Sequence, residues 1–212
     1  DRGDYPKTTG YGHLGRVLEV GSDVTMCEPG DRVLSFSNHA SLVKADAERM
    51  ALPVPEDVDG EELVFARMAG VSISSLRSSS VQPGDTVVVV GMGLVGSFAA
   101  QLFELAGADV LAVDIADSRL ERARECGIER TVNSAREDLE DVVVEWTDGE
   151  GAHAVVEAIG KSEVIDYLTR QPLVERQRRF HIGELDIIDD FPMLWTWFEE
   201  DAILERMGHP RL

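Results

Sequence analysis

Apolar and polar residues follow two different patterns along the chain, and the change falls near residue 83. Before it, the runs 16–20, 32–36 and 41–43 carry apolar residues between Gly and Pro turns. Alternating runs bounded by turn residues are typical of half-buried strands, so they predict an antiparallel barrel or sandwich. Residues 61–80 instead predict a helical connector that grades into a Ser-rich turn.

From residue 84 onward, apolar strands alternate with helical segments. The predicted strands are 86–90, 109–114, 130–132 and 154–159, and the predicted helices are 94–106, a second from Asp117 and a third from Ser134. Strands that are apolar throughout are typical of parallel sheets covered on both faces. Because short loops join the alternating elements, the crossovers must be right-handed. The predicted fold class is therefore α/β, with a doubly wound Rossmann parallel sheet.

The helices carry more detailed expectations. Asp117 is expected to cap the second helix, and residues 134–137 to form a capping box for the third. The residues expected to face inward are Leu94, Phe98, Leu102 and Leu105 in the first helix, Leu120 and Ala123 in the second, and Leu139, Val142, Val143 and Trp146 in the third.

A glycine-rich motif follows the first predicted parallel strand. It reads Gly91-Met92-Gly93-Leu94-Val95-Gly96, and Asp114 ends the next strand 18 positions after Gly96. In a dinucleotide-binding turn, the first glycine permits the tight bend, the second lets a pyrophosphate approach the backbone, and the third lets helix and strand pack closely. The helix N-terminus adds unpaired N–H groups and a partial positive charge. The motif therefore predicts a dinucleotide site.

Asp114 also bears on which dinucleotide binds. A carboxylate accepts hydrogen bonds from both hydroxyls of the adenosine ribose and repels a 2′-phosphate, which favours NAD over NADP. Arg119 lies five residues later and could bind that phosphate instead. Both cofactors remain open, with NAD preferred.

Composition and charge exclude several classes of protein. Hydrophobic residues make up 43% and charged residues 28% of the chain, which is typical of a globular protein. No run approaches the length of a membrane span and no targeting segment is recognisable, so a cytoplasmic location is expected. With 40 acidic against 20 basic residues, the net charge of -20 disfavours nucleic acid and membrane partners. Because 17 of those basic residues are Arg, the composition indicates a halophilic, haloarchaeal protein.

The order of these features resembles the medium-chain dehydrogenase/reductase superfamily, the relatives of zinc-type alcohol dehydrogenase. That resemblance implies a partial GroES-like barrel segment before the Rossmann domain. The implied organisation is a barrel segment at 1–60, a connector at 61–83, a Rossmann domain at 84–168 and an atypical C-terminal segment with an amphipathic helix at 169–212. The resemblance also implies that Arg119 flanks the ribose and that Ile159 contacts the adenine side of the cofactor.

The sequence departs from this family at the positions of the zinc ligands. Where the resemblance places a Gly-His-Glu motif, the chain reads Gly10-Tyr11-Gly12, and residues 64–80, where a third ligand is implied, contain no Cys, His, Asp or Glu. A catalytic zinc needs about three protein ligands, so neither a catalytic nor a structural zinc is expected. Tyr11 is the candidate catalytic residue, as a hydrogen-bond donor or general acid. The alternative for Tyr11 is a packed barrel aromatic.

Two functional hypotheses follow. The first is an NAD(P)-dependent oxidoreductase of the alcohol dehydrogenase type, which transfers hydride between nicotinamide and a small alcohol or carbonyl substrate without zinc. The second is a catalytically silent dinucleotide-binding subunit or remnant, since the chain looks truncated at both ends. A homo-oligomer is possible in either case, because the tail from residue 192 has an apolar helical stripe that could meet a second chain.

Overall fold

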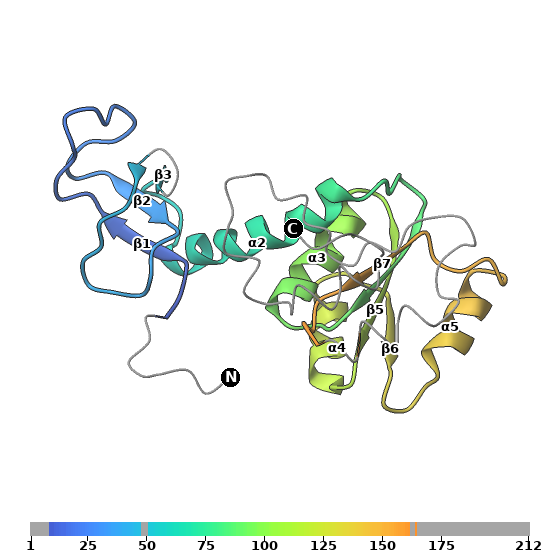
Figure 1. Ribbon diagram of the computed structural model, residues 1–212. Coiled ribbons are helices and arrows are strands. Elements are labelled where there is room, and N and C mark those ends of the chain that lie inside the picture. Colours follow the sequence, from blue (N-terminus) through green and yellow to red (C-terminus); the bar gives the residue numbers. More distant parts are fainter. Residues whose placement is uncertain (1–8, 48–50, 162–163, 165–212) are drawn as a thin grey trace, which may run out of the picture. The chain divides into compact units, whose positions relative to one another are not determined.

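The computed structural model describes residues 9–47, 51–161 and 164 (Figure 1). The predicted tail helix and the expected strand at 185–188 lie outside the described residues. The chain divides into two compact units, Asp1–Gly70 and Val71–Leu212.

The first unit contains a small antiparallel sheet with the strand order β1-β2-β3. Its strands are β1 (His13–Arg16), β2 (Arg32–Ser35) and β3 (Ala51–Pro53). Helix α2 (Gly60–Ser78) follows them and continues into the second unit, where the sequence predicts a separate connector. The antiparallel sheet fits a partial GroES-like barrel segment.

Two expected strands of the first unit are wrong. The strand expected at 16–20 ends at Arg16: Val17 still exchanges backbone hydrogen bonds with Gly30 and Asp31, but Leu18 and Val20 lie outside the strand and are exposed. No strand forms at 41–43, where Leu42 is 70% exposed, and β3 forms instead. In a short barrel segment, the pairing partner and not the alternation of side chains decides which run becomes a strand.

The second unit is built on a parallel sheet with the order β6-β5-β4-β7. The strands are β4 (Thr86–Val90), β5 (Asp109–Asp114), β6 (Arg130–Asn133) and β7 (Ala154–Glu157), and the helices are α3 (Leu94–Leu105), α4 (Asp117–Glu125) and α5 (Leu139–Trp146). The α/β fold class and the parallel sheet are confirmed. Within the described residues, we find no helix with the length and apolar character that a membrane crossing requires.

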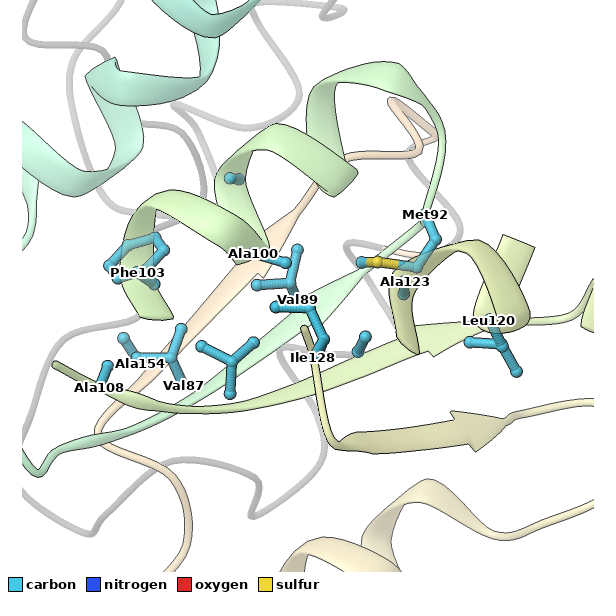
Figure 2. Packing of buried hydrophobic residues seen from close by; sticks show 13 residues of the cluster. Val87, Val89, Met92, Ala100, Phe103, Ala108, Leu120, Ala123, Ile128 and Ala154 are labelled. Carbon is cyan, nitrogen blue, oxygen red and sulfur yellow. The ribbon is translucent and has the colours of Figure 1, made fainter. Parts of the chain in front are cut away.

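Both faces of this sheet are covered. Val87 and Val89 of β4 belong to a core with α3 and α4, which Figure 2 shows in detail, whereas Val88 and Val90 belong to a second core with α5. Figure 1 likewise shows α3 and α4 on one side of the sheet and α5 on the other. Since alternate residues of a strand point to opposite faces, the run of valines serves both cores, and the sheet is doubly wound.

The buried face of α3 differs from the expected stripe. The helix buries Gly96, Ala99, Ala100 and Phe103, while Leu94 and Leu105 are 46% and 85% exposed. Small residues let the helix lie close to the strand, and this close approach turns the large leucines outward. The stripe built on Leu94, Phe98, Leu102 and Leu105 was therefore wrong.

Both expected helix caps differ from the structure as well. The N-cap of α4 is Ala116, and the Asp117 carboxylate instead accepts hydrogen bonds from Asn133 and Arg136. Helix α5 begins at Leu139 with Asp138 as its cap, because residues 133–137 form a separate turn around the Asn133 side chain. The expected inward residues of α4 and α5 are confirmed as buried or packed against the core.

Candidate dinucleotide-binding site

The turn between β4 and α3 depends on two glycines for its shape. Gly91 has a φ of 96°, a left-handed conformation that favours glycine, and its amide donates to the Val113 carbonyl at 2.7 Å. A Cβ on Gly96 would collide with the Gly91 carbonyl oxygen. These glycines therefore have the roles of tight turn and close helix–strand contact that the sequence predicts.

Gly93 lies in different surroundings. It is the N-cap of α3 in an extended conformation, it makes no side-chain cap, and a Cβ built on it meets nothing within 4 Å. The N-terminus of α3 therefore has no side-chain cap, and the space next to Gly93 is open. Such a helix end attracts anions, because its N–H groups and its dipole both present positive charge.

Asp114 links the end of β5 to this turn. Its Oδ2 accepts a hydrogen bond from the Met92 amide at 2.7 Å, and its Oδ1 accepts one from the Ala116 amide at 2.9 Å. Burial raises the pKa of Asp114, but the hydrogen bonds from Ala116, Met92 and Arg119 outweigh it and hold the pKa below its ordinary value. The carboxylate is therefore ionised at neutral pH, and its side chain is only 3% exposed.

Two arginines near Asp114 are engaged by carboxylates. Arg119 Nη1 lies 3.3 Å from Asp114 Oδ2, and Arg136 Nη2 lies 2.6 Å from Asp117 Oδ2. Asn133, buried at the end of β6, donates to the other oxygen of Asp117 at 2.6 Å. This second cluster was not predicted, although Asp117 follows β5 and Asn133 ends β6, both of which are visible in the sequence.

Ile159 meets the glycine turn from β7. A Cβ on Gly91 would lie 2.7 Å from Ile159 Cγ1, so the two residues are in contact. Glu157 holds this segment, since its Oε1 accepts from the amides of Ile159 at 2.7 Å and Gly160 at 2.9 Å. Burial raises the pKa of Glu157, and the two amide hydrogen bonds only partly offset it. Glu157 was not predicted either, although a carboxylate three residues before Gly160, at the end of an apolar run, is visible in the sequence.

The predicted cofactor-binding residues thus gather at one edge of the sheet. Gly91 to Gly96, Asp114, Arg119 and Ile159 all lie at the carboxyl ends of β4, β5 and β7, the edge where ligands of open α/β sheets bind.

Tyr11 lies in the first unit, beside α2. Its ring centroid is 5.5 Å from the guanidinium carbon of Arg67, and the Phe36 centroid is 4.4 Å from the same atom. His39 packs on Gly10, and His13 Nε2 is 3.1 Å from the Ala40 carbonyl oxygen. Across the residues that the structure describes, no three His, Cys, Asp or Glu side chains group together in a way that could hold a metal ion.

Comparison with known proteins agrees with this geometry. The family described as zinc-binding dehydrogenase matches residues 95–170. Sorbitol dehydrogenase of Halalkalibacterium halodurans is 29% identical over 187 residues, covering 73% of this chain and 54% of that protein. Erythritol/L-threitol dehydrogenase of Mycolicibacterium smegmatis is 30% identical over 195 residues, covering 86% of this chain and 51% of that protein. The chain therefore spans about half the length of these relatives.

A solved structure extends the likeness to the fold. Escherichia coli quinone oxidoreductase, complexed with NADPH, matches with a TM-score of 0.69 and 22% identity, covering 80% of this chain and 53% of that one. At this identity the likeness concerns the fold alone. Taken together, the glycine turn, the matched segment and the two dehydrogenases show that the chain carries a zinc-binding dehydrogenase domain, of the medium-chain dehydrogenase/reductase superfamily.

Proposed function

We propose that the chain binds a nicotinamide dinucleotide and acts in an oxidoreductase that transfers hydride between the nicotinamide and a small alcohol or carbonyl substrate. The observation that carries this proposal is the hydrogen bond from the Met92 amide to Asp114, which joins the glycine turn and the ribose-reading acid into one site. A bound nicotinamide supplies the hydride chemistry. The residues of this chain bind the dinucleotide, with the α3 N-terminus near the phosphates and Asp114 near the ribose.

We propose further that NAD is preferred over NADP. A 2′-phosphate would have to approach the ionised Asp114, and the nearest cation, Arg119, already pairs with that carboxylate. Arg136 is similarly held by Asp117. Exposed ion pairs contribute little binding energy by themselves. We therefore attribute the discrimination between NAD and NADP to the buried carboxylate of Asp114. NADPH remains the alternative, because the Escherichia coli neighbour is a complex with NADPH.

Titration of the chain with NADH and NADPH by calorimetry tests both proposals. We expect NADH to bind more tightly, and Asp114→Asn to weaken NADH by at least tenfold while leaving NADPH less affected. Asp109→Asn removes an acid from the other end of β5 and serves as the matched control. Unchanged NADH affinity in Asp114→Asn would show that the site is misassigned.

The proposed chemistry does not use zinc, although the family name implies one. The structure brings Tyr11, at a position where the resemblance places a metal ligand, next to Arg67 of the 64–80 segment. A guanidinium has no acceptor and repels a cation, so this donor set does not fit zinc. Elemental analysis of the purified chain checks the proposal, and one tightly held zinc per chain would contradict it.

The competing hypothesis is a catalytically silent nucleotide-binding subunit. Turnover of polyols and alcohols with NAD+, and of ketones with NADH, separates the two hypotheses, because a silent subunit binds the dinucleotide without oxidising or reducing any of these compounds.

A further inference from the structure

The Asp117 carboxylate, at the start of α4, makes two short polar contacts. Its Oδ1 accepts a hydrogen bond from Asn133 Nδ2 at 2.6 Å, and its Oδ2 pairs with Arg136 Nη2, also at 2.6 Å. The hydrogen bond from Asn133, together with the one from Arg136, holds the pKa of Asp117 below its ordinary value. Because the Asn133 amide is itself buried at the end of β6, it fixes the ionised carboxylate in the orientation that meets Arg136.

The fold places this ion pair beside Asp114. Strands β5 and β6 pair with Asp114 opposite Asn133, and the Ser134 amide donates to the Asp114 carbonyl oxygen at 3.2 Å. The turn that carries Arg136 therefore lies against the end of β5, and α4 begins with Asp117 three residues after Asp114. The Arg136 side chain is largely exposed, so a ligand at this edge of the sheet reaches it from solvent.

We propose that Asp117 is a specificity-determining residue, which keeps Arg136 away from the 2′-phosphate of NADP. The inference rests on the proposed dinucleotide function and adds a second contribution to its preference for NAD. An arginine near the ribose-reading acid is the group that accommodates a 2′-phosphate in dinucleotide sites. To reach Arg136, the phosphate must displace the Asp117 carboxylate, whose own charge repels it. Asp114 thus opposes the phosphate at the ribose, while Asp117 occupies the cation.

Calorimetric titration of the full chain and its Asp117→Asn variant with NADH and NADPH tests this role. Asparagine keeps an oxygen that accepts from Asn133 and removes the charge that pairs with Arg136. Because an exposed ion pair contributes little by itself, we expect NADPH affinity to rise by about fivefold and NADH affinity to change by less than about twofold. Unchanged NADPH affinity, or an equal gain for both dinucleotides, would overturn the inference.

Further variants decide whether the released arginine causes the gain. Arg136→Gln alone should leave NADPH affinity nearly unchanged, because Asp117 already holds this arginine. In the double variant, with Asp117→Asn and Arg136→Gln together, the gain should disappear. A gain that persists there would come from the lost negative charge alone and would overturn the role of Arg136. Glu145→Gln removes an exposed acid from α5 and is the matched control, with both affinities unchanged.

NADH binding separates this inference from the proposed function. If the unsubstituted chain binds NADH and Asp117→Asn gains no NADPH affinity, the dinucleotide site stands and only the role of Asp117 fails. If the unsubstituted chain binds neither NADH nor NADPH, the proposed function fails and the inference falls with it. Asp117→Ser also removes the charge, and it gives the same comparison if the asparagine variant does not fold.

Discussion

Gly93 and Gly96 lie three residues apart in the same turn and have opposite surroundings. A methyl group on Gly96 would strike the Gly91 carbonyl, whereas one on Gly93 would enter open space. We expect Gly96→Ala to destabilise the chain by about 1–3 kcal/mol, the usual cost of overpacking. Gly93→Ala should change the free energy of unfolding by only about 0.5 kcal/mol but weaken NADH binding, because the methyl group would face the phosphates. Urea unfolding and NADH calorimetry on both variants measure these effects.

An unfolded Gly93→Ala chain, or a Gly96→Ala chain as stable as the unsubstituted one, would show that the turn is packed differently. Normal NADH affinity in a folded Gly93→Ala variant would place the phosphates elsewhere.

Glu157 and Asp114 are expected to give the free energy of unfolding pH dependences of opposite sign. The pKa of Glu157 is raised in the folded state, so the folded chain holds this proton more tightly, and its contribution to stability is lost as the pH rises above the ordinary value of 4.5. Glu157→Gln keeps an acceptor oxygen without the charge, so its stability relative to the unsubstituted chain should increase as the pH rises through that range. The pKa of Asp114 is lowered, so its contribution is present above 3.8 and lost as the pH falls below it.

Urea unfolding of Glu157→Gln, Asp114→Asn and the unsubstituted chain from pH 3 to pH 7 compares the two residues. If the Glu157→Gln difference did not change with pH, or fell as the pH rose, burial would not be raising the pKa of Glu157.

Helix α3 shows that the buried face of an element depends on what it packs against. Its inward side is made of Gly96, two alanines and Phe103, while Leu105 points outward. Phe103→Ala should therefore cost about 3–5 kcal/mol through the cavity it leaves. Leu105→Ala should change stability by no more than about 0.5 kcal/mol, because its side chain is 85% exposed. Urea midpoints of the two variants give the comparison, and a larger loss for Leu105→Ala would restore the stripe predicted from the sequence.

The whole molecule carries a net charge of -20, which should govern its response to salt. Repulsion among carboxylates acts over about 30 Å at 0.01 M salt and about 3 Å at 1 M. Salt also weakens exposed ion pairs such as Arg16–Glu56 and Arg122–Glu125, but each such pair contributes little to stability. Because relief of repulsion sums over the whole surface, we expect the melting temperature to rise steeply between 0.1 M and 3 M KCl.

The melting series should be repeated in sulfate, so that screening is distinguished from exclusion of the salt from the protein surface. A flat or falling melting temperature in chloride would contradict the proposal that the chain is adapted to high salt.

The pattern of neighbouring residues along the chain determined the main strands and the glycine turn of this protein. The bounds of β4 and β5 were predictable because each strand is buried on both faces, so its interior is a continuous apolar run with polar residues only at its ends. The glycine turn and Asp114 were also predictable, since a left-handed backbone and a close contact leave glycine as the residue that fits.

Only the tertiary structure decided features that need a partner from elsewhere in the chain. The inward face of α3 follows from the distance at which the helix meets β4, and β3 exists because β2 pairs with it. The Asp117–Asn133 contact and the placement of Arg67 beside Tyr11 join residues 16 and 56 positions apart. Propensity and periodicity describe neighbours along the chain, whereas these contacts are selected by packing and by the need to pair buried polar groups across it.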